Sequence, residues 1–235
     1  MIEIKNVSKS YNGKTKALDK VSFNIENGKI FAFIGHNGAG KTTMIKSIMG
    51  IIDFDEGEIL INGNNIKTNP IKCKMDMAYL PDNPDLYENM RAIDFINFIC
   101  DIYNIPLETR KENVEKYATA FEMNNYLNDE ISSFSHGMKQ KVALISALCH
   151  EPKILIMDEP FVGLDPKAVF DMKKIMKDMA KEGKTIFYST HILDVAEKIC
   201  DEVAIIKKGR IIKVGKMKDI KGDESLEEVF LELGE

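Results

Sequence analysis

The stretch KIFAFIGHNGAGKTT, residues 29–43, decides the fold of this chain. It opens with a continuous apolar run, which is expected for a strand buried on both faces of a parallel sheet. The residues that follow, MIKSIMGII at 44–52, carry apolar side chains at the spacing of a helix. Between the two, GHNGAGKT at 35–42 matches the pattern GxxxxGK(S/T) at every fixed position. Strand, glycine-rich turn and helix in this order predict a phosphate-binding loop.

The residue types in this loop suit the phosphates of a magnesium–nucleotide complex. Its glycines let the backbone curl so that several N–H groups face one anion, and the following helix adds its positive N-terminal end. Lys41 can reach the β- and γ-phosphates, and the hydroxyl of Thr42 can ligate Mg²⁺. The nucleotide-binding residues predicted in the loop are Gly35, His36, Asn37, Gly38, Ala39, Gly40, Lys41, Thr42 and Thr43.

The composition is that of an ordinary globular protein. The 235 residues are 44% hydrophobic and 29% charged, and the net charge of −5 gives no general reason to expect nucleic acid or an anionic membrane surface as a partner. The four cysteines are scattered without a CxxC spacing, which favours reduced structural thiols. No apolar run approaches the length of about 20 residues needed to cross a bilayer, so a membrane role requires a partner that spans it.

The chain divides into three parts by its patterns. Short alternating stretches that end in Asn-Gly turns make the first third β, and three helices without strands make the middle an insertion. The last third alternates strand and helix, which predicts a parallel sheet. The predicted fold is α/β: a P-loop NTPase sheet flanked by helices, with an N-terminal antiparallel β subdomain and an inserted helical subdomain. We expect a discontinuous core at 1–83 and 151–222, the helical subdomain at 84–150 and a C-terminal helix at 223–235.

Two strand ends carry candidate catalytic groups. ILIMDEP at 154–160 places Asp158 and Glu159 where a buried strand ends. An aspartate there would hold Mg²⁺, and the adjacent glutamate would face the opposite way, toward the reacting water, as a general base. TIFYSTH at 185–191 ends on His191. A lone histidine is more often structural, but ligands of open α/β sheets gather at the carboxyl ends of strands, which favours a role in the site.

Residues 132–141, SSFSHGMKQK, contain an incomplete anion site. Ser135 occupies a plausible N-cap position of a helix. A Ser-His pair is also found in hydrolase sites, but no nearby acid would orient this histidine. The segment by itself leaves its partner groups unexplained.

Together these motifs resemble the ATP-binding cassette (ABC) ATPase family over nearly the whole chain, up to about residue 215. GHNGAGKT is similar to the family's P-loop, ILIMDE to its Walker B strand with the catalytic glutamate, and STH to its switch-histidine loop. FVGLDP is similar to its D-loop, with Asp165 at the aspartate position. The resemblance implies that Tyr11 stacks on adenine, although a tyrosine at a strand end is the simpler alternative, and that ATP and Mg²⁺ are the ligands.

FSHGM at 134–138 falls where the family has its signature, normally LSGGQ. The resemblance implies that Ser135, His136 and Gly137 face the γ-phosphate of a nucleotide held by a second cassette, so that two chains close head to tail around two ATP molecules. A protonated His136 would add positive charge there. Asp82, in AYLPDNPDLYEN, stands at the Q-loop position in place of the usual glutamine. It would reach Mg²⁺ through a water rather than directly.

The resemblance implies an ATP-hydrolysing subunit that powers a separate integral membrane permease, works as a dimer of cassettes, and sits peripherally at the cytoplasmic face of the membrane. In the family a coupling helix of the permease enters a groove of the helical subdomain. Tyr87, Phe95 and Phe98 could line that groove, with packing inside the subdomain as the alternative.

Other functions remain open to different degrees. The first alternative is a soluble ABC ATPase that acts on a ribosome, DNA or an assembly scaffold, although no nucleic-acid partner is expected from the charge. A kinase would use several arginines on the transferred phosphoryl group, and this chain has only Arg91, Arg110 and Arg210. A GTPase would need an NKxD motif, which is absent. A nucleotide-regulated binding module without turnover fits poorly with Glu159 and His191 in place.

Overall fold

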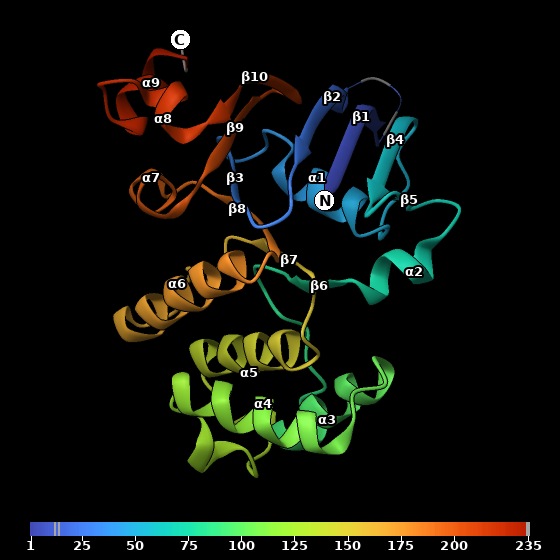
Figure 1. Ribbon diagram of the computed structural model, residues 1–235, viewed down its shortest axis with the longest axis vertical. Helices are drawn as coiled ribbons and strands as arrows, with labels where there is room; N and C mark the ends of the chain where they lie inside the picture. Colours follow the sequence, from blue (N-terminus) through green and yellow to red (C-terminus); the bar gives the residue numbers. More distant parts are fainter. Residues whose placement is uncertain (12, 14, 234–235) are drawn as a thin grey trace.

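The computed structural model describes residues 1–11, 13 and 15–233, in two sheets and a set of helices (Figure 1). The smaller sheet is antiparallel. Its strands, in spatial order, are β2 (Lys16–Ile25), β1 (Ile2–Ser10), β4 (Glu56–Ile61) and β5 (Asn64–Asn65). The larger sheet runs β10 (Arg210–Lys216), β9 (Glu202–Lys207), β3 (Ile30–Ile34), β8 (Thr185–Thr190), β7 (Ile154–Asp158) and β6 (Met77–Leu80). All its pairings are parallel except that of β10 with β9, so the predicted fold class is confirmed.

Strand β3 is buried along its whole length, as its continuous apolar run predicts. Ile30, Ala32 and Ile34 belong to one hydrophobic core, while Phe31 and Phe33 belong to a second core on the opposite face of the sheet. Alternate side chains of a strand point to opposite faces, so both faces of this strand need apolar residues. The strand that leads into the glycine-rich loop is therefore held by apolar packing on both of its faces.

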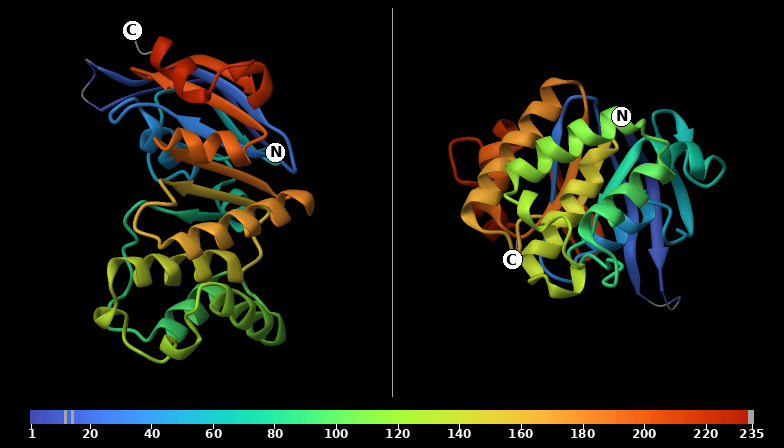
Figure 2. Two further views of the ribbon diagram at one scale, coloured as in Figure 1. Left: turned by 90° about the vertical axis from the view of Figure 1, so that its left-hand side faces the viewer. Right: turned by 90° about the horizontal axis from the view of Figure 1, so that it is seen from below.

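Helices cover the larger sheet and extend the molecule at both ends. The helices around the sheet are α1 (Lys41–Ile48), α2 (Pro70–Met75), α6 (Pro166–Lys181), α7 (Leu193–Ile199), α8 (Met217–Lys221) and α9 (Leu226–Glu232). The middle of the chain forms α3 (Ala92–Ile102), α4 (Leu107–Ala120) and α5 (His136–Cys149), with short 3-10 turns at Asn124–Tyr126 and Ile131–Ser133. These three helices gather at the end of the molecule opposite α9 (Figures 1 and 2).

Several short elements were not predicted from the sequence, and the bounds of others differ from the prediction. Strand β6 and helix α2 were not predicted, because β6 has four residues and α2 has six, too few to show a clear period. The basic stretch after β9 continues through β10 into the short helix α8, which the sequence pattern did not predict. The C-terminal helix spans Leu226–Glu232, which is shorter than the predicted range 223–235. Residues 234–235 of that range lie outside the described residues. The domain boundaries at 83/84, 150/151 and 222/223 stay predictions.

None of the helices in the described part of the chain combines the length and the apolar character that crossing a bilayer requires. Buried residues of α3, α4 and α5 belong to the same hydrophobic core as β7 and β8. The helical subdomain is thus packed onto the sheet.

His150, which follows α5, makes the stability of this core sensitive to acid. Its side chain is 6% exposed and its ring stacks on that of Tyr103, with centroids 3.7 Å apart and planes at 8°. Burial lowers the pKa of His150 to about 4, against about 6.5 for an unfolded histidine. At pH values between these two pKa values, the unfolded chain binds a proton on His150 that the folded chain does not. The contribution of His150 to stability is therefore fully present above pH 6.5 and is lost as the pH falls toward 4.

We expect His150 to contribute a loss of about 2 kcal/mol in the free energy of unfolding between pH 7 and pH 4.5. Urea unfolding of the wild type and of His150→Phe at both pH values would measure it. Phenylalanine keeps a ring against Tyr103 but cannot be protonated, so the variant should lose less stability than the wild type. Equal losses would contradict the assignment, because other titrating groups are common to both proteins.

Candidate functional site

A cavity of about 520 Å³ lies at the carboxyl ends of β3 and β7 and at the start of α1. Most of the predicted nucleotide-binding, metal-binding and catalytic residues meet in it. The residues that line it are Tyr11, Ala17, Asn37, Gly38, Gly40, Lys41, Thr42, Thr43, Asp82, Asp158 and Glu159. This is the edge of an open α/β sheet at which ligands generally bind.

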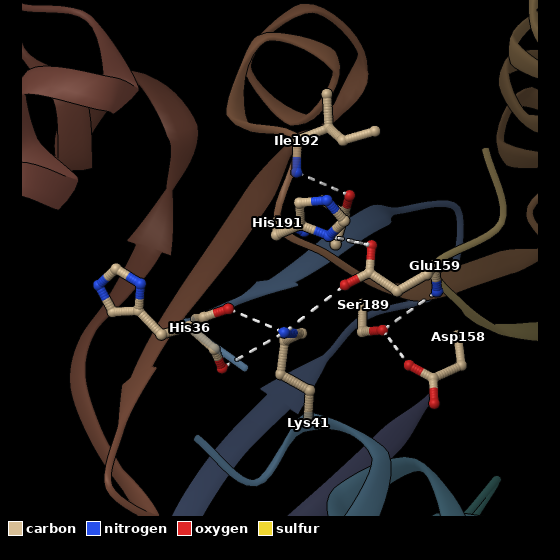
Figure 3. A network of polar contacts seen from close by, with 9 residues as sticks. His36, Lys41, Asp158, Glu159, Ser189, His191 and Ile192 are labelled. Atoms are coloured by element: carbon tan, nitrogen blue, oxygen red, sulfur yellow. Dashed lines mark hydrogen bonds and ion pairs between the residues drawn. The ribbon is translucent and has the colours of Figure 1, made fainter. Parts of the chain in front are cut away.

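The glycine-rich loop folds closely against its neighbours. Gly38 and Gly40 have φ values of 79° and 114°, which glycine adopts without strain. A side chain on Gly40 would meet the carbonyl oxygen of Ala17 at 2.5 Å, so no other residue fits there. The Lys41 side chain is only 7% exposed, and its Nζ donates to the carbonyl of Gly35 at 2.8 Å and to that of His36 at 3.5 Å (Figure 3). The loop therefore holds its lysine inside the cavity.

Glu159 connects the loop to His191. Its Oε1 lies 3.5 Å from Nζ of Lys41, and its Oε2 lies 2.9 Å from Nδ1 of His191 (Figure 3). The backbone N–H of His191 also donates to Oε2, at 3.3 Å. Glu159 has a φ of 47°, a conformation that costs energy for a residue with a side chain. The carboxylate is held at the end of β7 between two of the groups predicted from separate motifs.

Ser189 also belongs to this network, although the sequence pattern did not predict a role for it. It is fully buried in β8 and pairs in register with Asp158 of β7. Its hydroxyl donates to the Asp158 carboxylate and accepts from the backbone N–H of Glu159 at 3.3 Å. Its carbonyl accepts from the same N–H at 3.2 Å. The STH triplet was a signal for this residue, but its role depends on the register between two strands.

Acidic groups gather on one side of the cavity. Asp158, at the end of β7, is 3% exposed. Asp82 lies just after β6, the strand that pairs with β7. Burial, with the charges of these two carboxylates, raises the pKa of Tyr79 to about 12. The described residues contain no group of three or more His, Cys, Asp or Glu placed to hold a metal. Thr42 and Asp158 therefore offer few, all-oxygen ligands, which fits Mg²⁺ because that ion keeps waters and takes phosphate oxygens as well.

Tyr11 stands at the mouth of the cavity. Its side chain is 64% exposed, and its hydroxyl lies 3.3 Å from Oγ1 of Thr43. Lys9 Nζ lies 5.7 Å from the centre of its ring. An exposed ring beside the loop is free to stack on a base.

The signature residues lie away from the cavity and pack on the D-loop. Ser135 caps α5, its hydroxyl accepting from the N–H of Met138 at 3.3 Å. An added Cβ on Gly163 would lie 2.8 Å from Cδ2 of His136, and one on Gly137 would lie 2.8 Å from the carbonyl oxygen of Gly163. Ser135, His136, Gly137 and Asp165 are absent from the described lining of the cavity.

Asp165 serves two partners at this junction. Its Oδ1 caps α6 by accepting from the N–H of Ala168 at 2.8 Å, and its Oδ2 lies 2.7 Å from Nζ of Lys141 in α5. The Lys141 ammonium holds the pKa of the Asp165 carboxyl below its usual range. An ion pair thus joins the D-loop to the signature helix.

A second cavity, of about 230 Å³, lies between the sheet and the helical subdomain. Tyr79, Leu86, Phe95, Ile99 and Tyr103 are among its lining residues. Phe95 is 7% exposed and belongs to the core, whereas Tyr87 and Phe98 are 60% and 40% exposed with ring centroids 5.8 Å apart. The three aromatic residues predicted for a groove therefore divide into one core residue that also lines the cavity and two surface residues.

Comparison with known proteins places the chain among ATP-binding subunits of transporters. The family model "ABC transporter" matches residues 18–162. An uncharacterized ABC transporter ATP-binding protein of Methanocaldococcus jannaschii is 36% identical over 219 residues, which are 93% of this chain and 79% of that protein. A solved ATP-binding subunit of an ABC transporter covers 100% of both chains with a TM-score of 0.96 and 34% identity. A dimeric ATP-binding cassette in a post-hydrolysis state with ADP and Pi matches with a TM-score of 0.84, 25% identity, and 92% and 99% coverage.

Proposed function

This chain belongs to the ABC transporter family of ATP-binding proteins, and from that premise we propose that it binds and hydrolyses ATP to power transport through a separate membrane permease. The observation that carries the proposal is the Glu159 carboxylate, held between Lys41 of the phosphate-binding loop and His191. A base, a phosphate-binding cation and a second polar group meet there at one edge of the cavity. That arrangement suits in-line attack of water on a terminal phosphate.

Several residues of the cavity, together with the neighbouring His191, have distinct roles in this reaction. Tyr11 stacks on the adenine, while Lys41 and the N–H groups of the loop bind the β- and γ-phosphates. Glu159 accepts a proton from the attacking water, and His191 stabilises the γ-phosphate as charge shifts onto it. When Mg²⁺ is bound, Thr42 and Asp158 would hold it, and it would neutralise phosphate charge. Asp82 would contact its water shell.

A second copy of the chain completes the site. Ser135 and Gly137 stand at the N-terminus of α5, where backbone N–H groups and the helix dipole favour an anion, yet they lie outside the cavity of their own chain. Two chains arranged head to tail would place each signature against the other's γ-phosphate. That a similar cassette with ADP and Pi is dimeric supports the pairing of two chains. ATP closes the pair, and hydrolysis lets it reopen.

The permease would meet the helical subdomain beside the exposed rings of Tyr87 and Phe98, since the Tyr87 ring lies 6.1 Å from that of Phe95, which lines the second cavity. We place the protein at the cytoplasmic face of the membrane, attached through that partner. Mild-detergent extraction of membranes from cells that express a tagged chain should recover it with a polytopic membrane protein. Loss of this recovery in Tyr87→Ala/Phe98→Ala would support the contact. A wild-type chain found only with ribosomes or nucleic acid would contradict the transport role.

Gly163→Ala should lower ATP turnover at least about tenfold, because the added methyl would push the D-loop away from the signature histidine. Phosphate release measures the effect. Gly183→Ala is the matched control, since Gly183 has a φ of 83° against 81° for Gly163 but has open space around its Cβ position. Both variants bear the same backbone strain, and only the first clashes. Adding His136→Ala to Gly163→Ala should recover part of the activity. Equal turnover in the two glycine variants would contradict the coupling.

A further inference from the structure

The C-terminal helix reaches the phosphate-binding loop. The ring of Phe230 in α9 lies 4.7 Å from the ring of His36, centroid to centroid, with the planes at 53°. His36 is the second residue of GHNGAGKT, but its side chain is absent from the described lining of the cavity. Figure 3 shows its ring directed away from Lys41. The side chain of a loop residue thus binds to the tail of the chain rather than turning toward the phosphate site.

The backbone of His36 belongs to the hydrogen bonds that shape the loop. Its carbonyl accepts from the N–H of Ala39 at 3.1 Å and from Nζ of Lys41 at 3.5 Å. The orientation of this peptide group therefore affects both the turn of the loop and the place of its lysine. His36 is exposed to solvent, so the ring contact with Phe230 restrains a side chain that would otherwise be free to rotate.

Helix α9 is itself firmly anchored. Its first N–H, on Leu226, donates to Glu197 of α7 at 2.9 Å, and the other oxygen of Glu197 pairs with Lys221 at 2.9 Å. Ser225 and Glu228 form a capping box at its start, and Leu226 and Val229 are buried in the core. At its end, the carbonyl of Leu233 accepts from Lys207 of β9 at 3.0 Å. Phe230 is thus a half-buried ring on a fixed support.

We propose that Phe230 is a positioning residue for the phosphate-binding loop, and that its contact with His36 holds the loop in the conformation that binds the phosphates of ATP. The inference rests on the proposed ATPase function. A loop that is ordered beforehand loses less conformational freedom when the ligand binds, so affinity rises without a new contact. Phe230 acts through His36 and touches neither Glu159 nor His191 in the described contacts. Its loss should therefore weaken ATP binding more than it slows turnover.

A double-mutant cycle tests the contact, with titration of a fluorescent ATP analogue as the readout. Phe230→Leu, which keeps an apolar side chain in place, should raise the Kd about fivefold, within the range for an aromatic pair. His36→Ala should raise it by a similar factor. The double variant should bind no worse than either single variant, because both remove the same contact. Phe230→Tyr should stay within about twofold of the wild type, since it keeps the ring.

Controls distinguish a failure of the positioning role of Phe230 from a failure of the proposed ATPase function. Leu231→Ala changes a side chain that is 63% exposed on the same helix and should leave the Kd unchanged. A wild type that binds no nucleotide would overturn the proposed function itself. A wild type that binds, with Phe230→Leu binding equally well, would overturn only the positioning role. If the two single effects multiply in the double variant, Phe230 acts through the general stability of the tail, and the proposal also fails.

Discussion

Replacing Glu159 by glutamine should lower ATP turnover by at least about a hundredfold while leaving ATP binding intact. The amide is nearly isosteric with the carboxylate but cannot accept a proton from the attacking water. It also loses its charge toward Lys41, which lies 3.5 Å from Oε1, so the lysine is left more available to phosphate. Binding should therefore persist or tighten when the chemical step fails.

The Glu159→Gln substitution should also change how the chain assembles. If hydrolysis reopens the dimer, Glu159→Gln should accumulate as an ATP-bound dimer, which gel filtration with and without ATP would reveal. Glu151→Gln is a matched control, because Glu151 also has a positive φ, 54° against 47°, and is exposed away from the cavity. This variant should hydrolyse ATP at the wild-type rate and should not accumulate as an ATP-bound dimer. Unchanged phosphate release by Glu159→Gln would place the general base elsewhere.

Lys41→Ala should weaken ATP binding about a hundredfold, corresponding to about 3 kcal/mol for the loss of charged hydrogen bonds to phosphate. The side chain is nearly buried and already aimed into the cavity by the carbonyls of Gly35 and His36, so binding requires little rearrangement of it. Its removal also leaves Glu159 facing the phosphates without a cation beside it. Charge repulsion then adds to the lost contacts.

Titration of a fluorescent ATP analogue would measure the effect of Lys41→Ala directly. Lys46→Ala is the matched control, because it removes the same charge from the same helix. Lys46 lies about one turn after Thr43, the last residue of α1 that lines the cavity, so its loss should change the affinity by less than about twofold. Equal affinities of the two variants would mean that overall charge, rather than the position of Lys41, determines binding. A folded Lys41→Ala protein with wild-type affinity would refute the assignment of the loop.

Much of the site could be predicted because its parts are local. Gly38 and Gly40 indicate positive φ angles, which other residues rarely adopt. Lys41 and Thr42 follow them directly, at the start of a helix. The apolar run before Asp158 likewise marks a buried strand and the edge at which it ends. Such features depend on a few consecutive residues, whose steric preferences act wherever the segment lies in the chain.

What remained hidden depends on how distant segments meet. The hydroxyl of Ser189 reaches Asp158 only because β8 pairs with β7 in one particular register, and a shift by one residue would turn it to the other face. Phe95 and Phe98 look alike in sequence, yet their positions on α3 make one a core residue and the other a surface residue.

The sequence by itself determined that a glycine-rich loop joins a buried strand to a helix on an α/β sheet, and it predicted an acid pair and a histidine at strand ends and a helix capped by Ser135. The tertiary structure alone decided that the Glu159 carboxylate lies between Lys41 and His191, and that Phe230 of the tail packs on His36 of the loop. The physical reason is the range of the forces involved. Backbone sterics and capping act over a few neighbouring residues, whereas contacts across the fold are fixed by the packing of the whole core.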